Sequence, residues 1–81
     1  MTEDWTKVVR REVADALGMD SSELPDDARL DSTEGWDSLA QSIIIIRLEE
    51  LTGKPIDDDE ALRLVSLERL LELVRRRVGK G

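Results

Sequence analysis

Ser38 is the side chain in this sequence that is best placed for chemistry. It lies within the five residues Gly35–Leu39, between a long polar segment and a strongly apolar one. Gly35 permits a sharp chain reversal, and either Asp37 or Ser38 can cap a helix that begins there. Because Gln41 follows three residues later, Ser38 also completes a Ser-x-x-Gln capping box. The simplest interpretation of Ser38 is therefore a helix cap.

The composition limits what the Ser38 hydroxyl can do. The chain has 81 residues with no His and no Cys, which excludes disulfides, zinc sites, imidazole bases and Cys or His nucleophiles. We therefore expect neither an independent enzyme nor a metal site. A hydroxyl in the first turn of a helix is nevertheless accessible to a separate modifying enzyme. The backbone N–H groups and the dipole of that turn also stabilise a phosphate, so Ser38 is a candidate attachment point as well as a cap.

The charge of the chain indicates the kind of partner it binds. Its net charge is −7, from 19 acidic and 12 basic residues, which argues against nucleic acid and favours partners with basic surfaces. The longest apolar run, Ile43–Ile46, is too short to span a membrane, and the N-terminus lacks the features of a secretion signal. We expect residues 1–81 to form a single soluble domain that is cytoplasmic and monomeric and binds neither nucleic acid nor membrane.

Apolar periodicity predicts an all-α fold with three principal helices and one short helix, and no strand. The first helix begins after a Thr2 cap and ends at Gly18, and the second runs from about Ser38 to Thr52. A short helix is expected over Asp59–Leu64, and Ser66 is a plausible cap for the last one. The apolar stripes of the first and last helices consist of Trp5, Val8, Val9, Val13, Ala16 and Leu17, and of Leu67, Leu70, Leu71, Val74 and Val78. On the first helix Lys7, Arg10, Arg11 and Asp15 are expected to face outward.

A long loop separates the first two principal helices. Residues 19–35 show no clear period and are rich in Asp and Ser, although residues 21–24 are compatible with a short helical turn. Leu24, Ala28 and Leu30 are the apolar residues expected to anchor this loop in the core, and Trp36 is expected to pack against it. Long loops in small domains are usually functional or anchored in this way.

The second helix is apolar on two sides. At about 100° per residue, Ala40, Ile44, Leu48 and Leu51 share one side, whereas Leu39, Ile43 and Ile46 lie roughly opposite, next to Glu50. A helix that packs on one face needs only the first set. The second set is either buried by another element or exposed for a partner. The predicted core consists of Val9, Val13, Ile44, Leu48, Leu70, Leu71 and Val74.

The motif Asp37-Ser38-Leu39 and its surroundings resemble the acyl carrier protein family, whose members place Asp-Ser-Leu at the start of their second helix. The resemblance covers nearly the whole chain, through Asp27–Leu30, Leu48–Glu50 followed by Gly53, Ile56 with the acids after it, and Ser66–Leu67. It implies a small helical bundle with a long loop between its first two helices. It also implies that the domain is a covalent carrier and not an enzyme.

The resemblance further implies a cofactor and a set of partners. A 4′-phosphopantetheine arm would be attached to Ser38 by a phosphopantetheinyl transferase. Asp37 would help that transferase to recognise the site. The thiol of the arm would hold cargo as a thioester. The remaining partners would be an acyl- or aminoacyl-loading ligase or an acyltransferase, and a downstream synthase or transferase.

One departure from the family concerns the partner-facing side of the second helix. Many members have an acidic residue where this chain has Ile43, and Arg47 adds a positive charge there. We expect partners to contact Leu39, Ile43 and Ile46, with Glu49 and Glu50 as a polar rim. The alternative is that Ile43 packs under the long loop.

The departure at Ile43 argues against a general fatty-acid role. The segment Gly35–Leu39 also resembles carriers of polyketide and nonribosomal-peptide pathways more than the carrier of fatty-acid synthesis. Two other functions stay open. One is a non-covalent helical adaptor in which Ser38 is only a cap. The other is an aminoacyl or D-alanyl carrier that an adenylating ligase loads.

Overall fold

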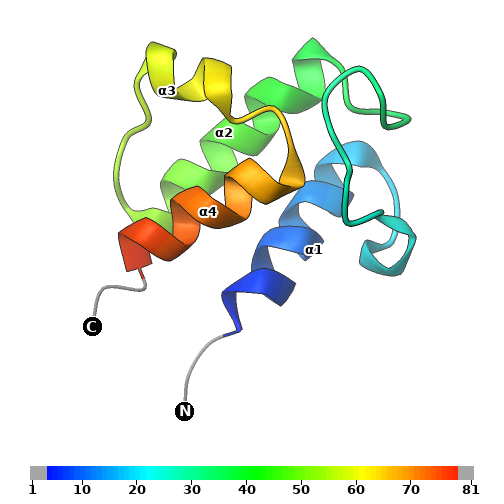
Figure 1. Cartoon of the computed structure of the whole chain (residues 1–81), viewed down its shortest axis with the longest axis horizontal. Coiled ribbons are helices and arrows are strands. Elements are labelled where there is room, and N and C mark those ends of the chain that lie inside the picture. The colour runs from blue at the N-terminus through cyan, green and yellow to red at the C-terminus, as the bar shows by residue number, and fades with distance from the viewer. Residues whose placement is uncertain (1–3, 79–81) are drawn as a thin grey trace.

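The computed structural model describes residues 4–78, with only the backbone at Val78, as four α-helices and no strand (Figure 1). The helices are α1 (Trp5–Leu17), α2 (Ser38–Thr52), α3 (Asp58–Arg63) and α4 (Leu67–Val78), and a short 3₁₀ turn, η1, spans Ser21–Glu23. The predicted all-α bundle is confirmed, and the bounds of α2 are those expected from the sequence. The long loop lies beyond the ends of α1 and α2 on one side of the molecule, whereas α3 lies on the other.

The caps explain where the first helix begins and ends. The Asp4 side chain accepts hydrogen bonds from the backbone N–H groups of Thr6 and Lys7, at 3.1 and 3.4 Å, and α1 begins at Trp5. The prediction that Thr2 is the cap is therefore wrong, and Thr2 itself lies outside the described residues. At the other end Gly18 has φ +77°, a left-handed conformation that favours glycine, so the predicted stop is confirmed.

The core lies where α1, α2 and α4 pack against one another. It includes six of the seven residues that the sequence predicts, whereas Leu71 is only half-buried and Leu73 is buried in its place. Leu71 lies at the edge of the apolar stripe and lines a shallow groove beside Thr6 and Arg10. The buried cluster consists of Val9, Val13, Ala14, Leu24, Ala28, Trp36, Ile44, Leu48, Ile56, Leu64, Leu67, Leu70, Leu73 and Val74. The predicted stripe member Val78 lies outside the described side chains.

The long loop is anchored at several points. Leu24 and Ala28 are buried, as predicted, and Leu30 is half-buried against the core. The loop also pairs with the segment between α3 and α4, because the Leu30 N–H donates to the Val65 carbonyl at 2.8 Å. The Leu67 N–H in turn donates to the Ala28 carbonyl at 2.9 Å. A loop anchored on both sides of its middle has little freedom to move.

Arg10 fastens the loop to α1. Its guanidinium donates to the carbonyls of Ser21, at 3.1 Å, and of Leu24, and forms an ion pair of 2.8 Å with Asp26. The sequence places Arg10 on the outward side of α1, and that expectation is wrong. Because a charged donor satisfies two loop carbonyls, Arg10 replaces the backbone pairing that an irregular segment lacks.

The C-terminal half is held by caps and ion pairs. Helix α3 begins at Asp58, one residue earlier than predicted, because the Asp57 side chain accepts from the Glu60 N–H at 2.8 Å. Glu60 also forms an ion pair of 2.8 Å with Arg77 of α4. Ser66 caps α4 as predicted, with its hydroxyl oxygen accepting from the Arg69 N–H at 3.2 Å.

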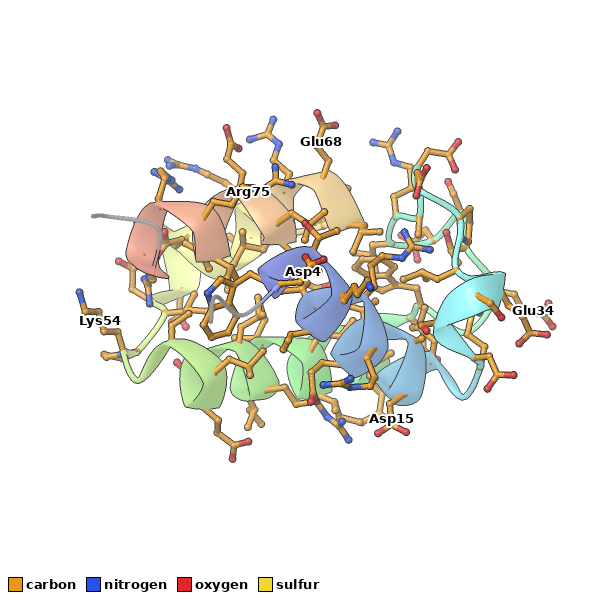
Figure 2. The ribbon with its side chains drawn as sticks, turned by 90° about the horizontal axis from the view of Figure 1, so that it is seen from below. Asp4, Asp15, Glu34, Lys54, Glu68 and Arg75 are labelled. Carbon is orange, nitrogen blue, oxygen red and sulfur yellow. The ribbon has the colours of Figure 1, made fainter. Side chains whose placement is uncertain are left out.

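Among residues 4–78 no helix is both long enough and apolar enough to cross a membrane. Charged side chains cover the surface, and Figure 2 shows Glu34, in the turn before α2, and Lys54, after α2, at opposite ends of the molecule. Helix α2 therefore runs along most of the length of the domain.

Candidate functional site at the start of the second helix

Asp37 and not Ser38 is the cap of α2. The Asp37 Oδ1 atom accepts a hydrogen bond from the Ala40 N–H at 2.9 Å, and its carbonyl accepts from the Gln41 N–H at 2.8 Å. Ser38 is the first residue inside the helix. The capping box predicted between Ser38 and Gln41 is therefore wrong. The simplest interpretation of Ser38, a capping side chain, is removed with it.

The Ser38 hydroxyl is accessible and unused. The residue is exposed, and within residues 4–78 its hydroxyl makes no hydrogen bond. Its carbonyl accepts from the Ser42 hydroxyl at 3.2 Å, one turn further along α2. An exposed serine that caps nothing leaves its oxygen available to a modifying enzyme.

Gly35 sets the course of the chain into α2. It has φ +86°, which a residue with a side chain rarely adopts. A Cβ atom at this position would also lie 2.9 Å from the Leu17 carbonyl oxygen at the end of α1. The reversal predicted at Gly35 is thus confirmed, and the close approach to α1 fixes where the turn lies.

Trp36 and Gln41 support the turn from inside. Trp36 is 2% exposed, which confirms its predicted packing role, and its indole N–H donates to Gln41 Oε1 at 2.7 Å. The amide group of Gln41 donates in turn to the Leu64 carbonyl at the end of α3, also at 2.7 Å. Sequence reasoning missed this role of Gln41, because the spacing from Ser38 suggested a local cap. No local pattern points to Leu64, which is 23 residues away.

The outer side of α2 carries exposed aliphatic residues. Leu39 is 71% exposed and Ile46 is 55% exposed, whereas Ile43 is half-buried. Glu50 is exposed beside them. Leu39 and Ile46 therefore present an apolar surface that begins one residue after Ser38.

Two charged residues assigned to that surface make contacts with other parts of the chain. Arg47 turns toward α1 and donates to Glu12 at 3.0 Å and to Asp15 at 2.8 Å. The hydrogen bonds to Glu12 and Asp15 raise the pKa of Arg47 above its ordinary value, so the guanidinium stays positive at physiological pH. Glu49 is half-buried, and its side chain accepts from the Ile56 N–H at 2.7 Å. The prediction of Arg47 as a charge on the partner face is wrong, whereas Glu49 lines a shallow groove together with Ile46 and Glu50, so its role as a rim stays a prediction.

The start of α2 fits a phosphodiester on Ser38. The hydroxyl is exposed, and a helix start leaves its first N–H groups without partners inside the helix. Asp37 satisfies the Ala40 N–H, which leaves the amides of Ser38 and Leu39 in the first turn. These amides and the helix dipole stabilise negative charge at this end of α2.

Comparison with known proteins agrees with this geometry. The family model described as "Phosphopantetheine attachment site" matches residues 7–74, which is most of the chain. An acyl carrier protein of Rubrobacter xylanophilus is 32% identical over 72 residues, which cover 89% of each chain. An acyl carrier protein of Solidesulfovibrio magneticus is 28% identical over 72 residues, covering 89% of this chain and 92% of that protein. One of Nitratidesulfovibrio vulgaris is 30% identical over 66 residues, covering 82% and 87%.

The match therefore spans the helices and the loop together and is not confined to the Asp-Ser-Leu motif. It includes the whole of α2 and the turn that leads into it. With a four-helix bundle, an accessible serine at the start of α2 and relatives of nearly the same length, this chain belongs to the acyl carrier protein family, whose cofactor is 4′-phosphopantetheine.

Proposed function

We propose that Ser38 is the residue that carries the phosphopantetheine arm, and that the chain uses it to deliver thioester-bound cargo to partner enzymes. The observation that carries this proposal is the division of labour between two neighbours. Asp37 caps α2, so the Ser38 hydroxyl is exposed and free of hydrogen bonds within residues 4–78. In the non-covalent adaptor Ser38 would be only a cap, whereas Asp37 is the residue whose side chain caps α2.

The residues around Ser38 supply position and not catalysis. When bound, the arm supplies a terminal thiol that holds the cargo as a thioester. The chain has no His or Cys to act as a base or nucleophile, and membership of the acyl carrier protein family points to a phosphopantetheinyl transferase as the enzyme that attaches the arm. Asp37 caps α2 through Oδ1, and its exposed position leaves the carboxylate within reach of the transferase. The two roles of Asp37 are compatible.

The partners and pathway form the finer part of the proposal. A loading ligase or acyltransferase and a downstream synthase or transferase would contact the outer side of α2 in the cytoplasm. We assign the chain to a polyketide, nonribosomal-peptide or related pathway. The support is the apolar character that Leu39 and Ile46 give to that surface. An acidic surface would instead suit a partner with a basic surface.

The attachment is tested by intact mass. The protein is incubated with coenzyme A and a broad-specificity phosphopantetheinyl transferase, and we expect a gain of one phosphopantetheine. Ser38→Ala should gain nothing while keeping its helices. Ser42→Ala is the matched control, because Ser42 is exposed one turn later on the same helix, and it should gain the arm normally.

Two results would change the conclusion. Modification of Ser38→Ala would place the arm on another residue, and failure of the unaltered protein to gain an arm would favour the adaptor. The mass of the arm-bound species purified from the native host separates the remaining possibilities. An amino acid on the thiol would support a carrier that an adenylating ligase loads, either for D-alanyl transfer or for nonribosomal-peptide synthesis. An acyl chain would support a polyketide or related carrier.

A further inference from the structure

Two hydrogen bonds join three separate parts of the chain next to Ser38. Trp36 belongs to the turn before α2, Gln41 to the first turns of α2, and Leu64 to the end of α3. The Gln41 side chain accepts from the Trp36 indole and donates to the Leu64 carbonyl, with both distances 2.7 Å. One side-chain amide thus binds the turn before α2 through its oxygen and the end of α3 through its NH2 group.

The Leu64 carbonyl is a group that needs such a partner. Leu64 follows the last residue of α3, and the final carbonyls of a helix find no N–H donor inside the helix. Leu64 itself is buried, so water has poor access to the residue. The amide of Gln41 satisfies a backbone group that is otherwise expensive to bury.

The turn that Gln41 holds leads directly to Ser38. The Trp36 N–H donates to the Thr33 carbonyl and the Trp36 carbonyl accepts from the Asp31 N–H, both at 3.0 Å. Gly35 lies against the end of α1. Gln41 adds a hydrogen bond to Leu64, the residue that follows α3, so residues 36–38 are held against α1, α2 and the end of α3 together.

We propose that Gln41 is a positioning residue for modification of Ser38. By fixing Trp36 against α2 and α3, it holds the peptide through Asp37 and presents the Ser38 hydroxyl to the transferase in one orientation. A transferase that must bring this hydroxyl to the phosphate of coenzyme A loses rate when the hydroxyl samples several orientations. The inference rests on the proposed function, because it concerns attachment at Ser38.

The test compares kcat/KM for modification by a phosphopantetheinyl transferase with coenzyme A. Gln41→Met keeps the length of the side chain and removes both hydrogen bonds, and we expect kcat/KM to fall by about tenfold. Trp36→Phe removes the indole donor and keeps an aromatic ring in the core, so it should reduce kcat/KM in the same direction. If Gln41 acts through Trp36, the double variant should lose less than the product of the two single losses.

Two further measurements separate positioning from general stability. Val74→Ala is a core variant on α4, away from the turn, chosen to lower the melting temperature at least as much as Gln41→Met. Assayed where both are folded, it should keep the kcat/KM of the unaltered protein. The indole N–H proton of Trp36 should exchange with water faster in Gln41→Met. Its NMR resonance is assigned by comparison with Trp5→Phe.

The outcomes distinguish this inference from the proposed function. If the unaltered protein is not modified, the attachment at Ser38 fails. If it is modified and Gln41→Met is modified equally fast, only the positioning role of Gln41 is overturned. A loss in Val74→Ala as large as that in Gln41→Met would also overturn it, because stability alone would then explain the effect.

Discussion

The two sides of α2 contain the same kinds of residue and serve different ends. On the inner side Ile44 and Leu48 are each 1% exposed, in contact with the other principal helices. On the outer side Leu39 and Ile46 are 71% and 55% exposed. Composition does not distinguish the two sides, because both are aliphatic.

The difference shows that burial and not residue type identifies the packing side of a helix. The inner side is covered because α1 and α4 pack on it, and Arg47 adds an ionic contact from α2 to α1 at its edge. The outer side faces away from those helices. Exposed aliphatic groups next to the proposed modification site are expected to be retained for contact with a partner.

The largest expected effect breaks the inner side. Leu48→Ala removes a fully buried side chain from the inner side of α2 and should lower the free energy of unfolding by about 2–5 kcal/mol. Since small domains have a total stability of roughly 5–15 kcal/mol, this loss is a large fraction of what holds the domain folded. Chemical denaturation followed by circular dichroism measures the change.

Ile46→Ala is the matched control for Leu48→Ala on the outer side. It truncates an aliphatic side chain two residues away that is more than half exposed, so its stability should change by less than about 0.5 kcal/mol. Equal losses in the two variants would contradict the distinction between the sides.

The features predicted correctly depend on residues close together in sequence. Helix α2 begins after Asp37 and ends before Gly53 because short side chains and glycine have local conformational preferences. The apolar period correctly selected Ile44 and Leu48 as core residues. Local preference failed where two caps competed, since Asp4 and not Thr2 begins α1.

The features missed depend on contacts between distant segments. Arg10 and Arg47 have long side chains whose partners belong to other elements, so helical spacing alone assigned them to the wrong surroundings. Leu73 replaced Leu71 in the core because the angle at which α4 packs on its neighbours decides which edge of its stripe is covered. Gln41 was assigned to a local capping box with Ser38, whereas its side-chain amide donates to the carbonyl of the distant Leu64.

An intermediate effect on stability is expected at Asp37, the cap of α2. Asp37→Ala removes the bond to the Ala40 N–H and should lower the free energy of unfolding by about 1 kcal/mol. Asp37→Asn keeps a capping oxygen and should be nearly as stable as the unaltered protein. We expect both variants to be modified more slowly by the transferase, because both lose the carboxylate charge. Normal modification of the Asn variant would limit Asp37 to its capping role.

The smallest effect on stability is expected on the outer side. Ile46→Ser should change the melting temperature little, because the residue is already exposed, but it removes apolar area from the surface proposed to contact the loading enzyme. We expect the arm to be loaded with cargo more slowly, measured on the same preparation as the melting temperature. Ile43→Asp should lower the melting temperature more, because Ile43 is half-buried and a carboxylate there loses hydration.

Leu62 of α3 provides the control for this last comparison, because it is 77% exposed and lies outside α2. Leu62→Ser removes an aliphatic group that is even more exposed than Ile46, so a general loss of apolar surface would slow loading in both variants. A specific contact through the outer side of α2 predicts slower loading only for Ile46→Ser. If Ile46→Ser is loaded at the normal rate, that side is not the docking surface for the enzyme tested, and its exposed aliphatic residues need another explanation.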